Sequence, residues 1–217
     1  MITIHEKPKR VDEELLSRLR KVSPSTIGHM TDTGFMKGLK SLSGGKLVGR
    51  AVTVKIPHLD SSAVHIAVNE LEAGDVLVVD MNGDYDRAAV GGMVAYATQV
   101  RGASGIVIDG GITDLDELRE LSLQVYYRSI TAITTRGLGI EGNIHVPVSI
   151  SGAVVMPGDI ILGDSSGVMV LHGTNEELLA IAKDAYEREQ RETITQRLDA
   201  GEPLMNISGA YKYINHR

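Results

Sequence analysis

The chain has 217 residues, of which 42% are hydrophobic and 23% are charged, and its formal net charge is −6. This length suits one large domain with appendages, and the acidic balance argues against nucleic acid as a partner. The absence of cysteine excludes disulfides, thiolate catalysis and iron–sulfur clusters. Because the sequence shows no secretory signal and no apolar run of the roughly 18 residues that a membrane helix needs, we expect a soluble cytoplasmic protein without a membrane partner.

The first part of the chain predicts an arm and two helices. Residues 1–10 look like a loose arm, and apolar residues at helical spacing predict an amphipathic helix from Asp12 to Lys21. Ser23 and Pro24 then supply an N-cap and a first-turn proline for a short second helix. We therefore separate an arm and helix, residues 1–22, from the core that follows.

Strands and helices alternate in the core. The expected elements are a strand at 51–56, a helix from Ser61 or Ser62 to Glu72, and strands at 76–80 and 105–109. The last two strands are continuous apolar runs, which is typical of strands covered on both faces. This alternation indicates an α/β fold with a partly parallel sheet.

The later elements are shorter. We expect strands at about 124–128, 130–134, 145–150 and 154–155, then a hairpin formed by 160–164 and 167–171. The core is thus assigned to residues 23–173. A long charged helix is predicted at 175–198, and its apolar face disappears beyond Tyr186. A helix that is polar all round is seldom stable alone, so we expect residues 174–217 to reach a neighbouring subunit.

The stretch from Gly91 to Glu117 is the predicted ligand site. In α/β sheets ligands bind beyond the carboxyl ends of strands, and here a strand end is followed by glycines, Asp109, Asp114 and Glu117. The glycines allow backbone amides to approach a ligand closely. The ordinary alternative is a capping box, in which Asp114 caps a helix and Glu117 reaches back to its amide.

Several familiar motifs are missing. The sequence has no Walker A loop, no dinucleotide fingerprint, no G-x-S-x-G and no histidines at metal-ligand spacing. Carboxylates and backbone amides remain for chemistry, and carboxylate oxygens suit a hard cation such as Mg²⁺.

The central stretch resembles the signature of the RraA-like family. Gly92, twenty further residues, Thr113-Asp114, two residues and Glu117 are similar to the family pattern G-x₂₀-R-D-x₂-E/D. The segments GRAVTV, AGDVLVVD and VPVSISGAVVMPGDIILGDSSGVMVL also resemble it, so the likeness covers roughly residues 20 to 205. The family includes divalent-metal-dependent 4-hydroxy-4-methyl-2-oxoglutarate aldolases, which also decarboxylate oxaloacetate, and the regulator of ribonuclease activity A.

The resemblance implies a fold and an assembly. The expected fold is an α/β/β/α sandwich of the phosphohistidine-swivelling type, a single domain with a long C-terminal helix. The expected assembly is a homotrimer or a hexamer, with active sites between subunits.

The resemblance also implies site residues. Asp114, with Glu117 beside it, would ligate Mg²⁺ or Mn²⁺, and an acidic residue from the C-terminal helix of a neighbour would complete the site. The candidates on that helix are Glu187, Glu189 and Glu192. The substrate carboxylate would be held by the backbone at Gly91, Gly92, Met93 and Val94, with Asp109 nearby.

Thr113 departs from the family pattern, which has arginine at this position. Arginine would stabilise the negative charge that develops as the C–C bond breaks, a role that a hydroxyl cannot fill. Arg87, shortly before the glycine pair, either compensates for this loss beside Asp114 and Thr113 or is a solvated loop charge.

These implications lead to three functional hypotheses. The first is a metal-dependent lyase acting on a small 2-oxo acid, by retro-aldol cleavage or by oxaloacetate decarboxylation. The second is a non-catalytic trimeric regulator that binds a protein partner. The third is a family member that acts on a different sugar acid.

Overall fold

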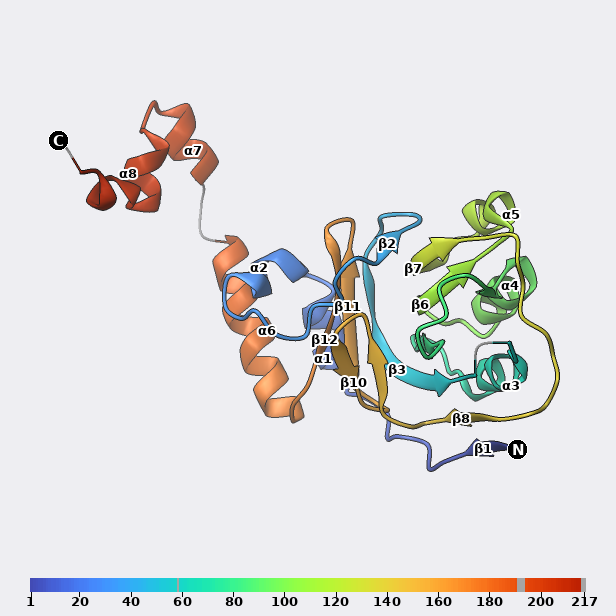
Figure 1. Ribbon diagram of the computed structural model, residues 1–217. Helices are drawn as coiled ribbons and strands as arrows, with labels where there is room; N and C mark the ends of the chain where they lie inside the picture. Colours follow the sequence, from blue (N-terminus) through green and yellow to red (C-terminus); the bar gives the residue numbers. More distant parts are fainter. Residues whose placement is uncertain (58, 191–193, 216–217) are drawn as a thin grey trace.

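The chain folds into four layers, seen in the computed structural model as helices, sheet, sheet and helices (Figure 1). The structure describes residues 1–57, 59–190 and 194–215. The α/β/β/α arrangement confirms the fold class expected from the sequence. Among these residues, no helix combines the length and apolar character needed to cross a bilayer.

Parallel strands form the centre of the main sheet. Its order is β1 (Ile2–Ile4), β8 (Gly142–Ile144), β3 (Leu47–Lys55), β4 (Val76–Asp80), β6 (Gly105–Ile112), β7 (Gln124–Ile130) and β2 (Lys40–Ser41). Strands β3, β4, β6 and β7 run parallel, and the short β5 (Ala88–Val90) joins β6 in the same direction.

Strand β3 connects the two sheets. Its second half pairs with β4, whereas its first half, up to Arg50, pairs with β11 (Ile160–Asp164). Strand β11 forms the predicted hairpin with β12 (Gly167–Leu171). A smaller hairpin of β9 (Val148–Ile150) and β10 (Ala153–Val155) packs in the same inner core.

Three apolar cores separate the four layers. Along β4, Leu77 and Val79 pack toward α3 (Ser62–Glu70), α4 (Gly92–Val100) and α5 (Leu115–Glu120), while Val76 and Val78 face the second sheet. Alternate side chains of a strand point to opposite faces, so this strand is apolar throughout because both of its faces are covered. The third core lies between the β11–β12 hairpin and α1 (Glu13–Leu19), α2 (Pro24–Gly28) and α6 (Asn175–Gln190).

The N-terminal arm, residues 1–10, is attached to the core and is not the loose segment expected, since its residues Ile2–Ile4 form the edge strand β1. Strand β1 pairs in parallel with β8, and the amide of His5 donates to the carbonyl of Ile144 at 3.0 Å. Ion pairs hold the rest of the arm, since Lys7 and Arg10 both contact Glu72 at 3.1 and 2.8 Å.

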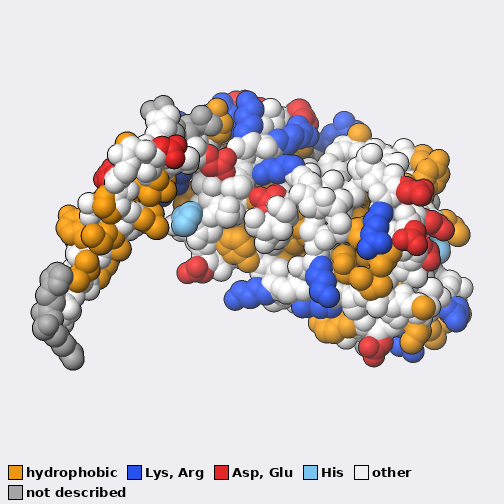
Figure 2. Space-filling model, turned by 90° about the horizontal axis from the view of Figure 1, so that it is seen from above, with side chains coloured by type: hydrophobic (Ala, Val, Ile, Leu, Met, Phe, Trp, Pro, Cys, Tyr) orange, Lys and Arg blue, Asp and Glu red, His pale blue; other side chains and the backbone are white. Residues whose placement is uncertain are grey.

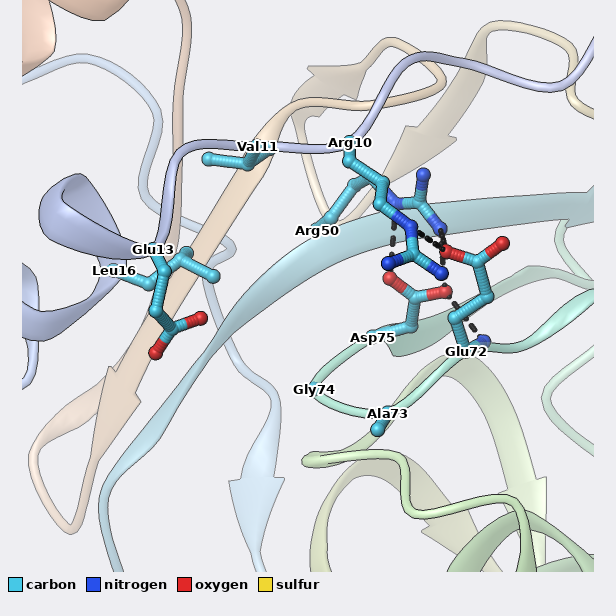
Figure 3. A pocket seen from close by; sticks show the side chains of 9 residues that line it. All are labelled: Arg10, Val11, Glu13, Leu16, Arg50, Glu72, Ala73, Gly74 and Asp75. Carbon is cyan, nitrogen blue, oxygen red and sulfur yellow. Dashed lines mark hydrogen bonds and ion pairs between the residues drawn. The ribbon is translucent and has the colours of Figure 1, made fainter.

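A pocket of about 240 Å³ beside this arm shows how the core anchors it (Figure 3). Arg50, 4% exposed, forms a bidentate ion pair with Asp75 at 2.9 and 2.8 Å. The same guanidinium donates to the carbonyl of Pro8 at 3.0 Å and lies 3.3 Å from Glu72. The arm is therefore attached through charged groups of the core.

Two predicted strands differ from the structure. Strand β7 ends at Ile130, because the amide of Ile133 turns back to Oγ1 of Thr131 at 3.1 Å and only an isolated bridge between Ala88 and Thr134 continues the pairing. The strand expected at 145–150 is reduced to β9, because His145 has a φ of 59° and breaks the extended backbone after β8.

The C-terminal helix also differs from the prediction. Helix α6 ends at Gln190, and residues 191–193, which include the candidate Glu192, lie outside the described residues. Helices α7 (Ile194–Asp199) and α8 (Leu204–Ser208) and the 3₁₀ turn Ala210–Tyr213 follow; none has a buried residue. Figure 1 shows this C-terminal arm, residues 194–215, projecting away from both sheets, and Figure 2 shows apolar side chains on its surface.

Candidate functional site

The candidate site lies where two parallel strands end side by side. Strand β5 leads into Gly91 and Gly92, and β6 leads into Thr113 and Asp114. The amide of Thr113 donates to the carbonyl of Val90 at 3.0 Å, which holds the two strand ends in register. The glycine pair and Asp114 therefore meet at one edge of the main sheet, as the sequence predicted.

Asp114 does not cap its own helix. It occupies the N-cap position of α5 in a left-handed conformation, φ 56° and ψ 44°, and its side chain makes no capping hydrogen bond there. Its Oδ2 instead accepts the amide of Gly92, the first residue of α4, at 2.9 Å. The capping-box interpretation is thus wrong for Asp114, because the backbone turn aims the carboxylate at a different helix.

Glu117 packs against the same glycine. A Cβ added to Gly92 would lie 1.8 Å from Oε2 of Glu117, and one added to Gly91 would lie 2.4 Å from Oδ2 of Asp114. Any side chain at either position would occupy the space of a carboxylate. The glycine pair therefore allows the two carboxylates to approach the backbone closely, and no positive φ is involved.

The start of α4 also offers free backbone donors. The first intrahelical bond joins the amide of Ala95 to the carbonyl of Gly91 at 3.0 Å, so the amides of Met93 and Val94 have no acceptor within the helix. The side chain of Met93 is 81% exposed, whereas that of Val94 packs in the core. These amides can receive an anionic group at the helix N-terminus.

Thr113 adds a hydroxyl and no charge to the site. Its Oγ1 donates to Oδ1 of Asp114 at 3.2 Å. This hydrogen bond orients the carboxylate but cannot stabilise negative charge as a guanidinium does.

Arg87 is held by a different carboxylate. Its Nη1 donates to Oδ2 of Asp84 at 2.9 Å, and its carbonyl accepts the amide of Gly111 at 3.1 Å. Burial raises the pKa of Asp84, but the Arg87 guanidinium and the amides of Asp86 and Arg87 outweigh it and hold this pKa below its ordinary value. The structure thus places Arg87 near the start of β5 with its charge directed at Asp84.

Asp109 belongs to a separate cluster. Its carboxylate accepts Nε of Arg128 at 3.0 Å and the amide of Ser151 at 2.6 Å, and the same guanidinium stacks 5.1 Å above the ring of Tyr85. Ser151 lies in the turn between β9 and β10, which pack on the face of the main sheet opposite α4. Asp109 is therefore not brought together with Asp114.

Arg128 was not singled out from the sequence. The sequence offers one signal for it, a charged residue within a largely apolar predicted strand, because a buried charge requires a partner. In the structure this strand, β7, pairs with β6, which carries Asp109.

Glu189 lies in the outer helical layer, on the far side of both sheets. Its Oε1 accepts the amide and hydroxyl of Ser23 and the hydroxyl of Thr26 at 2.6 to 2.7 Å. Burial raises its pKa, but these hydrogen bonds and the Lys46 ammonium hold the pKa below its ordinary value. Glu187 is exposed beside Lys183. Neither glutamate meets Asp114 of its own chain.

No three acidic or histidine side chains lie close enough together to hold a metal in the part of the chain that the structure describes. Asp114 and Glu117 nonetheless supply two sets of oxygen donors around Gly92. Mg²⁺ is commonly bound by one or two carboxylates, with waters and substrate oxygens as further ligands. The residues present therefore fit half of a metal site.

Fold and site together define a class of protein. It has a four-layer α/β fold, and two carboxylates contact the N-terminus of a helix at the point where two parallel strands end. Residues 18–170 match the sequence profile of the RraA-like family, described as Aldolase/RraA. The chain belongs to this family, which confirms the resemblance noted in the sequence.

Individual relatives agree with this assignment. A Halalkalibacterium halodurans protein, provisionally named 4-hydroxy-4-methyl-2-oxoglutarate aldolase, is 34% identical over 174 residues, which are 78% of this chain and 82% of that protein. A Thermus thermophilus protein with the same name, without the provisional mark, is 32% identical over 61% of this chain and 80% of its own length. Streptomyces coelicolor RraAS2, described as an unusual member of the RNase ES inhibitor RraA family, superposes with a TM-score of 0.74 at 28% identity, covering 84% of this chain and 96% of that one.

Proposed function

We propose that this protein is a divalent-metal-dependent lyase that cleaves a C–C bond of a small 2-oxo acid. The observation that carries the proposal is the contact of the Asp114 and Glu117 carboxylates with the first residue of α4. Relatives named for aldol cleavage of a 2-oxo acid support the same reaction class.

Asp114 and Glu117 would hold the metal, Mg²⁺ or Mn²⁺. When bound, such a cation supplies a Lewis acid next to the substrate's keto oxygen. Thr113 then has a positioning role, because its hydroxyl orients Oδ1 of Asp114.

The start of α4 would bind the substrate's carboxylate. The amides of Met93 and Val94 point out of the helix N-terminus, where the helix dipole favours an anion. A carboxylate bound there would lie beside Asp114 and Glu117, so its adjoining keto group would be close to these two side chains.

A second subunit would complete the site, in a homotrimer or a hexamer. The exposed face of α4 next to the glycine pair carries Met93, Tyr96 and Val100, which are 81, 60 and 67% exposed. Apolar side chains also cover the C-terminal arm. Surfaces of this kind mark protein interfaces, and a neighbour on α4 could bring an acidic residue, with Glu187, Glu189 and Glu192 as candidates.

A non-catalytic regulator is the second candidate. In the described part of the site, the neutral Thr113 stands where the catalytic pattern has arginine. Arg87, which could replace that charge, is bound to Asp84. The relationship to RraAS2, described as a member of an RNase inhibitor family, supports this alternative. Under it the exposed face of α4 binds a protein partner.

The test is pyruvate release from oxaloacetate and from 4-hydroxy-4-methyl-2-oxoglutarate, with Mg²⁺ or with a chelator. We expect metal-dependent release that Asp114→Ala abolishes. Asp116→Ala is the matched control, since this residue lies in the same helix with a fully exposed side chain. Thr113→Arg measures the cost of the missing charge. A wild-type chain without turnover and a Thr113→Arg variant with turnover would favour the regulator.

A mixing experiment tests the shared site. Asp114→Ala chains and Glu192→Gln chains, each inactive alone, should regain activity after dissociation and reassembly together, because some mixed sites then have both residues intact. Light scattering should show trimers or hexamers. No recovery with any of the three glutamate variants would contradict a shared site.

A further inference from the structure

His145 is an unusual buried residue outside the candidate site. Its side chain has no solvent exposure, its φ is 59°, and neither ring nitrogen has a hydrogen-bond partner among the described residues. Buried polar groups nearly always have partners, and this imidazole has only a long ion-pair contact, 3.5 Å from Nε2 to Oε2 of Glu70, so its place in the interior needs an explanation.

Charged groups surround this ring from three elements. From α3, Oε2 of Glu70 lies 3.5 Å from Nε2. From the N-terminal arm and from β3, the cations Lys7 and Arg50 act on the ring. Burial lowers the pKa of His145 below its ordinary value near 6.5; Glu70 opposes this effect, and the two cations add to it. The folded protein therefore holds the ring neutral near pH 7.

The same ring sits at the attachment of the N-terminal arm. His145 directly follows β8, the strand that pairs with β1, and the amide of His5 bonds the carbonyl just before it. Lys7 donates to the backbone carbonyl of Glu70, whose carboxylate faces the ring. The arm and the imidazole thus share neighbours on β8 and α3.

We propose that His145 is a pH-sensitive latch for the N-terminal arm, so that proton uptake by its ring below neutral pH releases residues 1–10 from the sheet edge. With the arm attached, a proton on the ring would be buried and would face Lys7 and Arg50. With the arm released, Lys7 moves away, so a proton on the ring no longer meets this cation.

The direction follows from linkage. The proton binds more tightly to the released state, so the attached state has its full stability above about pH 6.5 and loses stability as the pH falls below this value. For one linked proton, the opening equilibrium constant of the arm rises up to about tenfold per pH unit in this window. The hydrogen bond from Lys7 outweighs burial and holds the pKa of Glu72 below its ordinary value, so this carboxylate stays ionised throughout the window.

The experiment is hydrogen exchange of the full chain between pH 7.5 and 5.5, read on residues 1–10 by mass spectrometry and corrected for the intrinsic pH dependence of exchange. We expect the opening constant to rise as the pH falls. His145→Gln, which has a neutral side chain of similar size, should give a flat profile. His5→Gln is the matched control, because His5 is an exposed histidine of the arm whose Nε2 lies 3.2 Å from Asn143.

Three outcomes would overturn the proposal. They are a flat profile in the unchanged chain, a rise that persists in His145→Gln, and a rise that disappears in His5→Gln. The first and third are decisive even if His145→Gln fails to fold.

Discussion

Replacing Gly92 with alanine separates the folding role of the glycine pair from its role in the site. The new Cβ would lie 1.8 Å from Oε2 of Glu117, and ordinary contact begins at 3.4 Å, so the carboxylate must move by about 1.6 Å. The obstructing atom is the end of a flexible side chain, so Glu117 can rotate away. The backbone at Gly92 has no positive φ and accepts alanine.

The expected change in stability is small. Alanine reduces the freedom of the unfolded chain, which favours folding by about 0.4 to 1 kcal/mol. Displacing Glu117 into a less favourable rotamer costs about 0.5 to 1.5 kcal/mol. The two effects nearly cancel, so the free energy of unfolding should change by less than about 1 kcal/mol.

The expected loss is in metal binding. Displacing a carboxylate that ligates or orients a metal typically lowers affinity by about 10- to 100-fold. Binding of Mn²⁺ should be followed by electron paramagnetic resonance, with unfolding in urea measured on the same preparations. Gly137→Ala is the control, since its Cβ would meet only Ser62 Oγ at 3.8 Å.

Two results would refute this reasoning. Unchanged Mn²⁺ affinity in Gly92→Ala would show that Glu117 has no part in a metal site. A loss of several kcal/mol of stability would show that Glu117 cannot rotate away. The double variant Gly92→Ala/Glu117→Ala should restore any lost stability without restoring the affinity.

Three further predictions concern the fold, and each is checked by urea denaturation. Arg50→Ala leaves the buried Asp75 unpaired and should cost about 3 to 5 kcal/mol, part of which Arg50→Met/Asp75→Asn recovers. Asp60→Asn should cost about 2 to 3 kcal/mol. Burial raises the pKa of Asp60, but four hydrogen bonds outweigh it and hold this pKa well below its ordinary value of 3.8. The ionised carboxylate therefore contributes fully to the stability of the fold above about pH 4, and this contribution is lost in stronger acid. The Asp60→Asn variant should lack this acid dependence. Gly49→Ala should cost about 1 to 3 kcal/mol or more, because its Cβ would lie 2.1 Å from the fixed backbone carbonyl of Gly74. If one of these three variants is as stable as the unchanged chain, the contact on which its prediction rests is contradicted.

The sheet was predictable because local pattern and burial agree. The apolar runs at 76–80 and 105–109 lie in β4 and β6, which are covered on both faces as their composition required. The order of these strands beside helices then placed the glycine pair and Asp114 at one sheet edge, and the structure has them there.

The details of the site depended on contacts that local patterns do not encode. The run Asp114 to Glu117 has the residue types of a capping box, and only the left-handed backbone at Asp114 redirects its carboxylate to α4. Asp109, like Asp114, is an aspartate that follows a run of apolar residues, yet its carboxylate is bound by Arg128 on the neighbouring strand. The edge strand β1 was missed because its partner, β8, lies far along the chain.

The division of β3 between two sheets has a consequence for folding during synthesis. Its second half finds β4 soon after both leave the ribosome, but residues Leu47 to Arg50 await β11 at 160–164. At about 5 to 20 residues per second, this delay lasts roughly 5 to 20 s. Throughout that time Leu47 and Val48, fully buried or nearly so in the finished protein, form an open strand edge to which another nascent chain can add. Slower translation ahead of β11 would lengthen this period, whereas a chaperone that covers the edge would protect the chain until the second sheet closes.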